Sequence, residues 1–133
     1  MKRLLVDTGP LVALCDPADR LHGRAVSELD RIKGALMLSL PVLTEACFLL
    51  PGAHLRRRVF ALIEREVLRL EAPKNGEVVT RRALEWLEHY PDHRPDFADA
   101  FLVAWAENEP ALGIWTFDRE FSTVWRTLGG KKL

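Results

Sequence analysis

Short strand-like segments that alternate with helical segments constrain the fold of this chain more than any other feature. Four segments are predicted to be strands, three of them mainly apolar and the third along the chain alternating apolar with cationic residues: 3–6, 35–40, 67–70 and 113–117. Segments with helical spacing or helix start signals lie between them, at 21–33, 42–50, 54–66, 77–90 and 96–109. Because helices separate successive strands, the pattern favours an α/β fold in which a parallel sheet is covered on both faces.

Length and composition fit a single globular domain. The chain has 133 residues, 48% of them apolar, and its 19 Lys and Arg balance 19 Asp and Glu. This balance excludes a disordered chain, which would be poor in apolar residues and carry a high net charge. We expect one domain over residues 1–128 and a loose tail over 129–133.

Neither the apolar runs nor the net charge points to a membrane or to a purely electrostatic nucleic-acid binder. The longest nearly uncharged run, 34–44, has 11 residues, whereas a spanning helix needs roughly 20. Only three apolar residues lie between the cations Lys2 and Arg3 and the acid Asp7, too few for the apolar core of a signal peptide. We therefore expect a cytoplasmic protein without membrane contact.

A nucleic-acid binder that works by charge alone would show a basic excess, which is absent here, although residues 55–70 carry five Arg against two Glu.

Five acidic residues from four parts of the chain are predicted to meet at one edge of the sheet. Asp7 and Asp118 each follow a predicted strand, and the carboxyl ends of parallel strands share one edge, where ligands bind. Glu45 lies in the first turns of the helix after the second strand, so it faces the same edge. Asp96 and Asp99 are three residues apart at the start of a helix, which places both on one helix face.

Such a cluster predicts a divalent metal ion and chemistry on phosphodiesters. Carboxylates a few ångströms apart in a partly buried cleft repel each other. Mg²⁺ or Mn²⁺ accepts carboxylate oxygens as ligands and cancels their charge. Acids, a metal and no dedicated phosphate-binding loop together suggest hydrolysis of phosphodiester bonds. Each acid has a structural alternative: Asp7, Asp96, Asp99 and Asp118 as turn formers or helix caps, and Glu45 as a solvent-facing side chain. The interpretation therefore depends on the combination.

The order and spacing of these acids resemble the PIN-domain family, and most closely its small toxin ribonucleases of the VapC kind. The resemblance covers nearly the whole chain. The segments that carry it are Val6–Leu14, Asp19 with His22, Leu43–Ala46, Phe97–Ala104 and Thr116–Phe121.

The resemblance implies a three-layer α/β/α sandwich with a four- or five-stranded parallel sheet and a Mg²⁺- or Mn²⁺-dependent endoribonuclease activity. It makes Asp7, Glu45, Asp99 and Asp118 the core catalytic and metal-binding acids, with Asp96 as an auxiliary metal ligand. Thr8 and Thr116 would orient carboxylates or phosphate, or would be ordinary hydroxyls at strand ends. Arg119 would contact phosphate or pair with a carboxylate.

The same resemblance implies an RNA substrate that is single-stranded or in a loop, a homodimer, and a small antitoxin protein as partner. One alternative is a non-catalytic or stand-alone PIN-like module that binds RNA or protein. A second is a receiver-type or phosphatase-like α/β domain with an aspartyl nucleophile. That class needs a second acid close to Asp7 and a late lysine, but Thr8 and Gly9 follow Asp7, and the late lysines Lys131 and Lys132 lie in the tail.

Overall fold

A computed structural model describes residues 3–89 and 96–118 of the chain. Its sheet has four strands in the order β3-β2-β1-β4, and every pairing is parallel. The strands are β1 (Arg3–Val6), β2 (Leu36–Leu38), β3 (Leu68–Leu70) and β4 (Leu112–Trp115). This confirms the predicted α/β fold with a parallel sheet, and β3 is an outer strand as expected.

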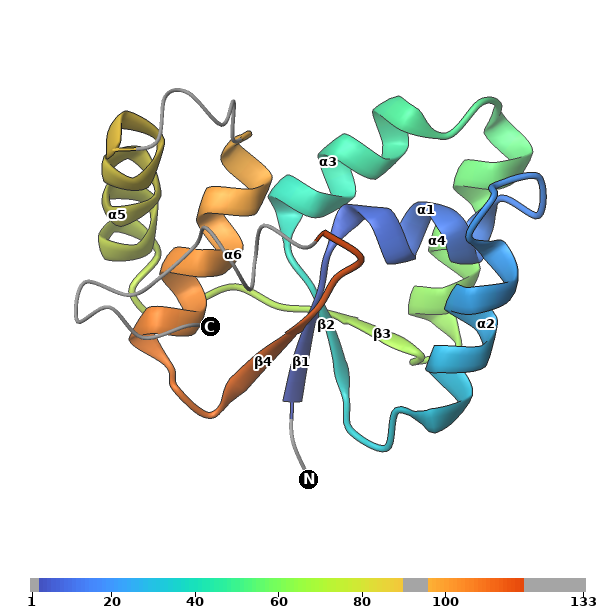
Figure 1. The fold of residues 1–133 in the computed structure, drawn as a ribbon, viewed down its shortest axis with the longest axis horizontal. Coiled ribbons are helices and arrows are strands. Elements are labelled where there is room, and N and C mark those ends of the chain that lie inside the picture. The colour runs from blue at the N-terminus through green and yellow to red at the C-terminus, as the bar shows by residue number, and fades with distance from the viewer. Residues whose placement is uncertain (1–2, 90–95, 119–133) are drawn as a thin grey trace.

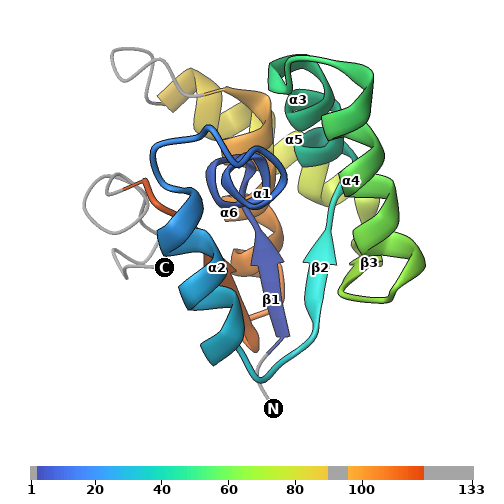
Figure 2. The same ribbon diagram turned by 90° about the vertical axis from the view of Figure 1, so that its right-hand side faces the viewer.

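The helices of the described residues cover both faces of this sheet. They are α1 (Thr8–Cys15), α2 (His22–Arg31), α3 (Leu40–Leu49), α4 (Ala53–Glu64), α5 (Gly76–His89) and α6 (Phe97–Asn108). Helices α1 to α4 lie on one side of the sheet, and α5 and α6 lie on the other (Figures 1 and 2). The chain steps from β1 to β2 to β3 and then returns to the far side of β1. Right-handed crossovers in opposite directions place the two helix groups on opposite faces, so the three-layer sandwich is confirmed.

The core consists of apolar side chains from the strands and from the sheet-facing sides of the helices. Leu5 and Leu38 in the sheet and Leu11 and Leu102 in the helices are fully buried. Trp105, in the second half of α6, is 1% exposed and belongs to the core. Helix α6 is therefore a buried element, and the position of its first turn is set by its packing.

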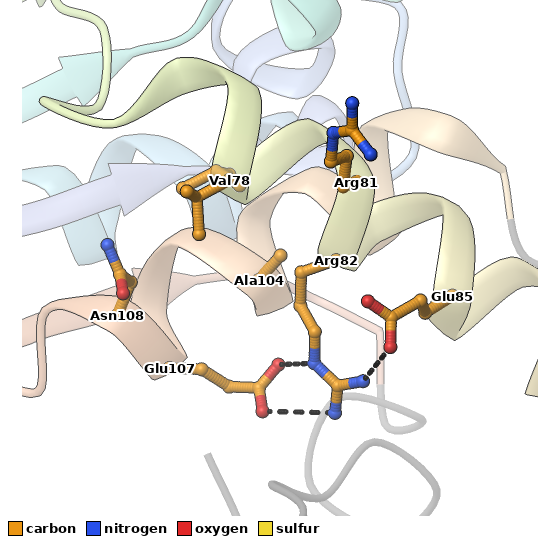
Figure 3. A pocket seen from close by; sticks show the side chains of 8 residues that line it. Val78, Arg81, Arg82, Glu85, Ala104, Glu107 and Asn108 are labelled. Carbon is orange, nitrogen blue, oxygen red and sulfur yellow. Dashed lines mark hydrogen bonds and ion pairs between the residues drawn. The ribbon is translucent and has the colours of Figure 1, made fainter.

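A charged cluster fixes α6 against α5. Arg82 Nε donates to Glu107 Oε1 at 3.2 Å and Nη2 donates to Oε2 at 3.3 Å, so the pair is bidentate (Figure 3). Trp86 Nε1 also donates to Glu107, and the Arg82 guanidinium carbon lies 4.7 Å from the Trp86 ring centroid. Two parallel hydrogen bonds define relative position as well as adding energy. The cluster therefore holds the two helices in one register.

Several smaller predictions concern the ends of the chain and the membrane. Among the described residues, no helix is long and apolar enough to cross a membrane. Part of the predicted domain, 119–128, and the predicted tail, 129–133, lie outside the described residues. The domain boundary therefore stays a prediction.

Candidate active site

Asp7 occupies the carboxyl end of β1, where the strand passes into α1. Its backbone N–H donates to Trp115 O at 2.9 Å, and its side chain is the N-cap of α1. Oδ1 accepts a hydrogen bond from Thr8 N at 2.8 Å, and Oδ2 accepts one from Thr116 Oγ1 at 2.6 Å. The residue is 5% exposed. Since each oxygen has a donor, the buried carboxylate is held in one orientation.

Thr116 joins the end of β4 to Asp7. Its Oγ1 donates to Asp7 and accepts a hydrogen bond from Asp118 N at 2.9 Å. The strand predicted to reach residue 117 ends at Trp115, because its partner β1 ends at Val6 and the chain then enters α1. Thr116 is thus free to turn toward Asp7 and to place the backbone of Asp118 beside it.

Glu45 lies in the second turn of α3, which begins at the carboxyl end of β2. Ser39 caps this helix: its Oγ accepts a hydrogen bond from Val42 N at 3.4 Å, and Pro41 occupies the first turn. A Ser cap and an early Pro are typical start signals of a helix, and they place the beginning of α3 at Leu40, two residues before the predicted 42–50. The cap fixes where the helix begins, and Glu45 becomes half-buried at the sheet edge.

Asp96 and Asp99 belong to the first turn of α6. Asp96 is the N-cap, and its Oδ1 accepts a hydrogen bond from Asp99 N at 2.8 Å. The structural role of Asp96 as a cap is therefore present, while Asp99 makes no such cap. Figure 1 shows α1, α3 and α6 all beginning at the same edge of the sheet, where β1 and β2 have their carboxyl ends, although α6 lies on the opposite face from α1 and α3.

The carboxyl groups interact strongly with one another. Burial, followed by the charges of Asp7, Asp96 and Glu45, raises the pKa of Asp99 to about 8. A hydrogen bond shared with Asp96, together with burial, raises the pKa of Glu45 to about 7, although the nearby Thr8 hydroxyl opposes this. The acids that sequence reasoning grouped are therefore neighbours in space.

The pKa of Asp7 is also raised by its surroundings. Burial raises its pKa, while the hydrogen bonds from Thr116 and Thr8 lower it. The charges of Asp96 and Asp118 raise it further. Asp118 is exposed, but it is close enough to act on Asp7.

Seven of the eight predicted site residues thus lie at one edge of the sheet: Asp7, Thr8, Glu45, Asp96, Asp99, Thr116 and Asp118. The eighth, Arg119, lies outside the described residues. The catalytic and metal-binding roles of all eight stay predictions.

Comparison with known proteins agrees with this arrangement. The model of the PIN domain matches residues 4–125, which is most of the chain. The chain belongs to the PIN-domain family. Among curated proteins, none matches the sequence.

A solved structure is similar to this one over nearly its full length. Mycobacterium tuberculosis VapC20, a toxin that cleaves the Sarcin–Ricin loop, superposes with a TM-score of 0.78 at 26% sequence identity. The match covers 93% of this chain and 96% of VapC20. The resemblance read from the sequence is therefore confirmed at the level of family and fold.

The edge of this PIN domain fits a hydrated divalent cation in its donor chemistry. Within residues 3–89 and 96–118, no three His, Cys, Asp or Glu side chains are placed to hold an ion directly. Mg²⁺, however, usually binds through one or two carboxylates and keeps several waters. Thr8 Oγ1 is buried and has no hydrogen-bond partner of normal geometry among the described residues. A buried hydroxyl needs a hydrogen-bond partner, which a water bound to the cation would supply. Carboxyl groups with raised pKa values would ionise more readily beside a positive ion. Both features fit a hydrated divalent cation.

Sequence reasoning missed a groove that opens from this edge. Its volume is about 610 Å³, and Glu45 and Asp96 are among the residues that line it. Leu40 and Phe48 of α3 also line it, and they are 60% and 86% exposed. One signal was available in the sequence: Phe48 is three residues after Glu45, so it shares the helix face of the acid and not that of the buried Val42 and Ala46.

Proposed function

We propose that this PIN-domain protein is a Mg²⁺- or Mn²⁺-dependent endoribonuclease that hydrolyses phosphodiester bonds of RNA. The observation that carries the proposal is the gathering of Asp7, Glu45 and Asp99 from three separate elements, with the pKa of each raised. Structural carboxylates normally pair with cations or accept hydrogen bonds that lower their pKa. A cluster that repels itself is instead typical of a functional site.

The acids of the cluster would bind the cation. Asp7, Glu45, Asp99 and Asp118, with Asp96 as auxiliary, would hold the cation, which when bound lowers the pKa of a coordinated water and offsets negative charge on the phosphate. Asp7 would be the ligand with the most fixed orientation, because it is buried and its carboxylate accepts two hydrogen bonds.

Two threonines and one acid would act on the substrate side. Thr116 keeps Asp7 in place through its 2.6 Å hydrogen bond. The buried Thr8 hydroxyl lies near Glu45 and would contact a water or a phosphate oxygen there. In the metal-free protein Glu45, with a pKa of about 7, can hold or release a proton near neutral pH, and it would give up that proton on binding the cation. In-line attack of water on phosphorus would leave a 5′-phosphate and a 3′-hydroxyl. Arg119 is proposed to contact the phosphate.

We also propose that the protein is the toxin of a type II toxin–antitoxin pair and that it works in the cytoplasm as a homodimer. The similarity to the toxin VapC20 supports this role. Its partner would be a small antitoxin protein that covers the acidic edge. A short open reading frame beside the gene, whose product binds the protein and stops cleavage, is the expected finding; its absence would favour a stand-alone nuclease.

The test of the nuclease activity is cleavage of labelled RNA by metal-free protein before and after addition of Mg²⁺ or Mn²⁺. Single-stranded RNA, stem-loops and a Sarcin–Ricin loop fragment should be compared. Asp7→Asn and Asp99→Asn should abolish the cleavage without unfolding the protein. The exposed Asp30, which lies on α2 away from the cluster, supplies the matched control, Asp30→Asn.

Two results would overturn the assignment. Full activity of Asp7→Asn or Asp99→Asn would remove that residue from the site. Binding of RNA without cleavage by the metal-loaded wild type would favour the non-catalytic module.

A further inference from the structure

Arg24 on α2 lies against the end of β4, next to the candidate active site. Its guanidinium carbon is 4.4 Å from the centroid of the Phe117 ring, and its Nε donates to Glu28 Oε2 at 2.8 Å. Phe117 lies between Thr116 and Asp118 in the chain, and both of these residues belong to the edge at which the carboxylates gather. The contacts therefore place a cation beside the acidic edge.

Phe117 also places this cation close to the first turn of α1. A Cβ built on Gly9 would lie 3.9 Å from Phe117 Cδ2, so the ring lies over the backbone of that turn. The turn follows Asp7, whose side chain caps α1. The pKa of Asp7 is set mainly by burial, then by hydrogen bonds from two threonines and by two acids, and Arg24 is not among these influences. Arg24 therefore lies beside the carboxylate cluster and does not neutralise Asp7.

The groups that hold Arg24 also join α2 to β4. Glu28 accepts a second hydrogen bond, from Trp115 Nε1 at 2.8 Å. Trp115 is the last residue of β4, where it pairs with Val6. The guanidinium is thus positioned by a side chain that is itself bound to the sheet, and a cation that is held in place before a ligand arrives loses less entropy on binding it. The same contacts fasten α2 to the sheet, so a test has to separate binding from stability.

The charge of the edge and the shape of the guanidinium favour a phosphate as the ligand. Burial and the charges of the neighbouring acids raise the pKa of Asp99, which indicates an excess of negative charge at this edge. An RNA that approaches it is repelled, and a fixed cation beside the acids offsets part of the repulsion. Glu28 binds Nε of Arg24 and Phe117 covers one guanidinium face. The terminal nitrogens of a guanidinium form a planar fork that matches two phosphate oxygens.

We propose that Arg24 binds the RNA phosphate next to the scissile phosphate, at the part of the edge formed by Phe117 and Asp118. The inference rests on the proposed ribonuclease function and deepens it. It assigns to the substrate at least one phosphodiester beyond the bond that is cleaved. A dinucleoside monophosphate, which has a single phosphate, would therefore gain nothing from Arg24.

The first test is a cycle that combines protein and RNA changes. The substrates are a short single-stranded oligoribonucleotide and copies of it in which one phosphate flanking the cleaved bond is replaced by a neutral methylphosphonate. Arg24→Ala should raise KM by about 5- to 30-fold on the unmodified RNA, as expected for one charge-assisted contact near the surface, and should change kcat little. On the copy that lacks the contacted charge, wild type and Arg24→Ala should have the same KM. The same holds for a dinucleoside monophosphate.

The matched control is Arg31→Ala. Arg31 is an exposed arginine in the last turn of the same helix, about 10 Å farther along the axis than Arg24. Glu28, between them, bonds to Trp115, which precedes Phe117, so α2 runs away from the acidic edge. Arg31→Ala removes the same charge from the same helix and should leave KM unchanged on every substrate.

The second test measures the charge of the contact. The slope of log KM against log salt concentration should be smaller by about 0.7 for Arg24→Ala, the value for one phosphate contact on a single strand. Arg24→Lys should keep the wild-type slope but recover only part of KM, because an ammonium lacks the planar fork. A KM that rises equally on all substrates, or a slope that does not change, would overturn the phosphate contact and leave Arg24 a structural role.

The outcomes also separate this inference from the function on which it rests. No cleavage of any RNA by metal-loaded wild type would refute the ribonuclease proposal, and the same cycle is then measured as the Kd of fluorescein-labelled RNA, where a missing coupling refutes the contact. Cleavage with an unchanged KM for Arg24→Ala would refute only the contact. If Arg24→Ala converts a dimer to a monomer in light scattering, with no coupling to any phosphate, Arg24 contacts a second copy of the chain, and the phosphate site is refuted.

Discussion

Replacing Asp99 by Asn should make the metal-free protein more stable at neutral and alkaline pH. A pKa of about 8, compared with the ordinary 3.8, means that the folded protein resists ionisation of this group. At pH 7 the corresponding penalty is about 4 kcal/mol, at 1.36 kcal/mol for each pKa unit between 3.8 and 7. Asn carries no charge, so the substitution Asp99→Asn removes this penalty.

Two effects reduce the net gain from Asp99→Asn. The negative charge in the first turn of α6 interacts favourably with the helix dipole, which contributes up to about 1 kcal/mol. The repulsion is also shared with Glu45, which takes up a proton and relieves part of it in the wild type. We therefore expect Asp99→Asn to raise the free energy of unfolding by about 1–3 kcal/mol at pH 8.

The stability gained through Asp99→Asn should depend on pH. A group with a raised pKa in the folded state contributes no penalty below its unfolded pKa of 3.8, and the penalty grows until the pH exceeds about 8. The advantage of Asp99→Asn should therefore be largest at pH 8 and vanish near pH 4.

The assay is urea unfolding in a chelator at pH 4, 6 and 8. Asp30→Asn, which changes an exposed carboxylate on α2, should stay within about 0.5 kcal/mol of wild type. A variant that is less stable than wild type at pH 8, or a difference that does not depend on pH, would refute the repulsion argument and favour a structural role for Asp99.

Three further predictions follow from the same contacts. Addition of Mg²⁺ or Mn²⁺ should raise the melting temperature of wild type more than that of Asp99→Asn, and more at pH 8 than at pH 5; equal shifts in calorimetry would contradict metal binding at the cluster. Thr116→Val leaves Asp7 Oδ2 buried without its donor and should lower the free energy of unfolding at pH 7 by about 1.5–3 kcal/mol, measured by urea denaturation; a neutral result would mean that water replaces the hydroxyl. Glu107→Leu removes the buried partner of Arg82 and leaves it the exposed Glu85, so it should destabilise by about 1–3 kcal/mol, whereas the double variant with Arg82→Met should recover most of this; equal stability of the single and double variants would show that the pair is not coupled.

Local patterns were enough to predict the four strands, five of the six helices of the described residues and the positions of the acids; helix α1 was not predicted, because residues 8–15 are almost all apolar and show no helical periodicity. The start of α3 at Leu40 follows from a Ser cap and an early Pro, and both are read directly from neighbouring residues. Asp7 and Asp118 were placed at strand ends because an apolar run stops at each. The shared edge of a parallel sheet then predicted that these acids meet, and the raised pKa values agree with that.

The surroundings of each acid depended on contacts that no local pattern contains. Asp7 is buried and bound by Thr116, 109 residues away in the chain, because the strand order places β4 directly beside β1. Likewise, the exposure of Phe48 depends on what α6 leaves uncovered on α3. The amino-acid sequence alone thus determined the α/β class and the set of acids, since periodicity and strand ends are local properties. The tertiary structure decided the strand order, the burial of Asp7 and the groove at Phe48, since these arise only when distant segments pack together.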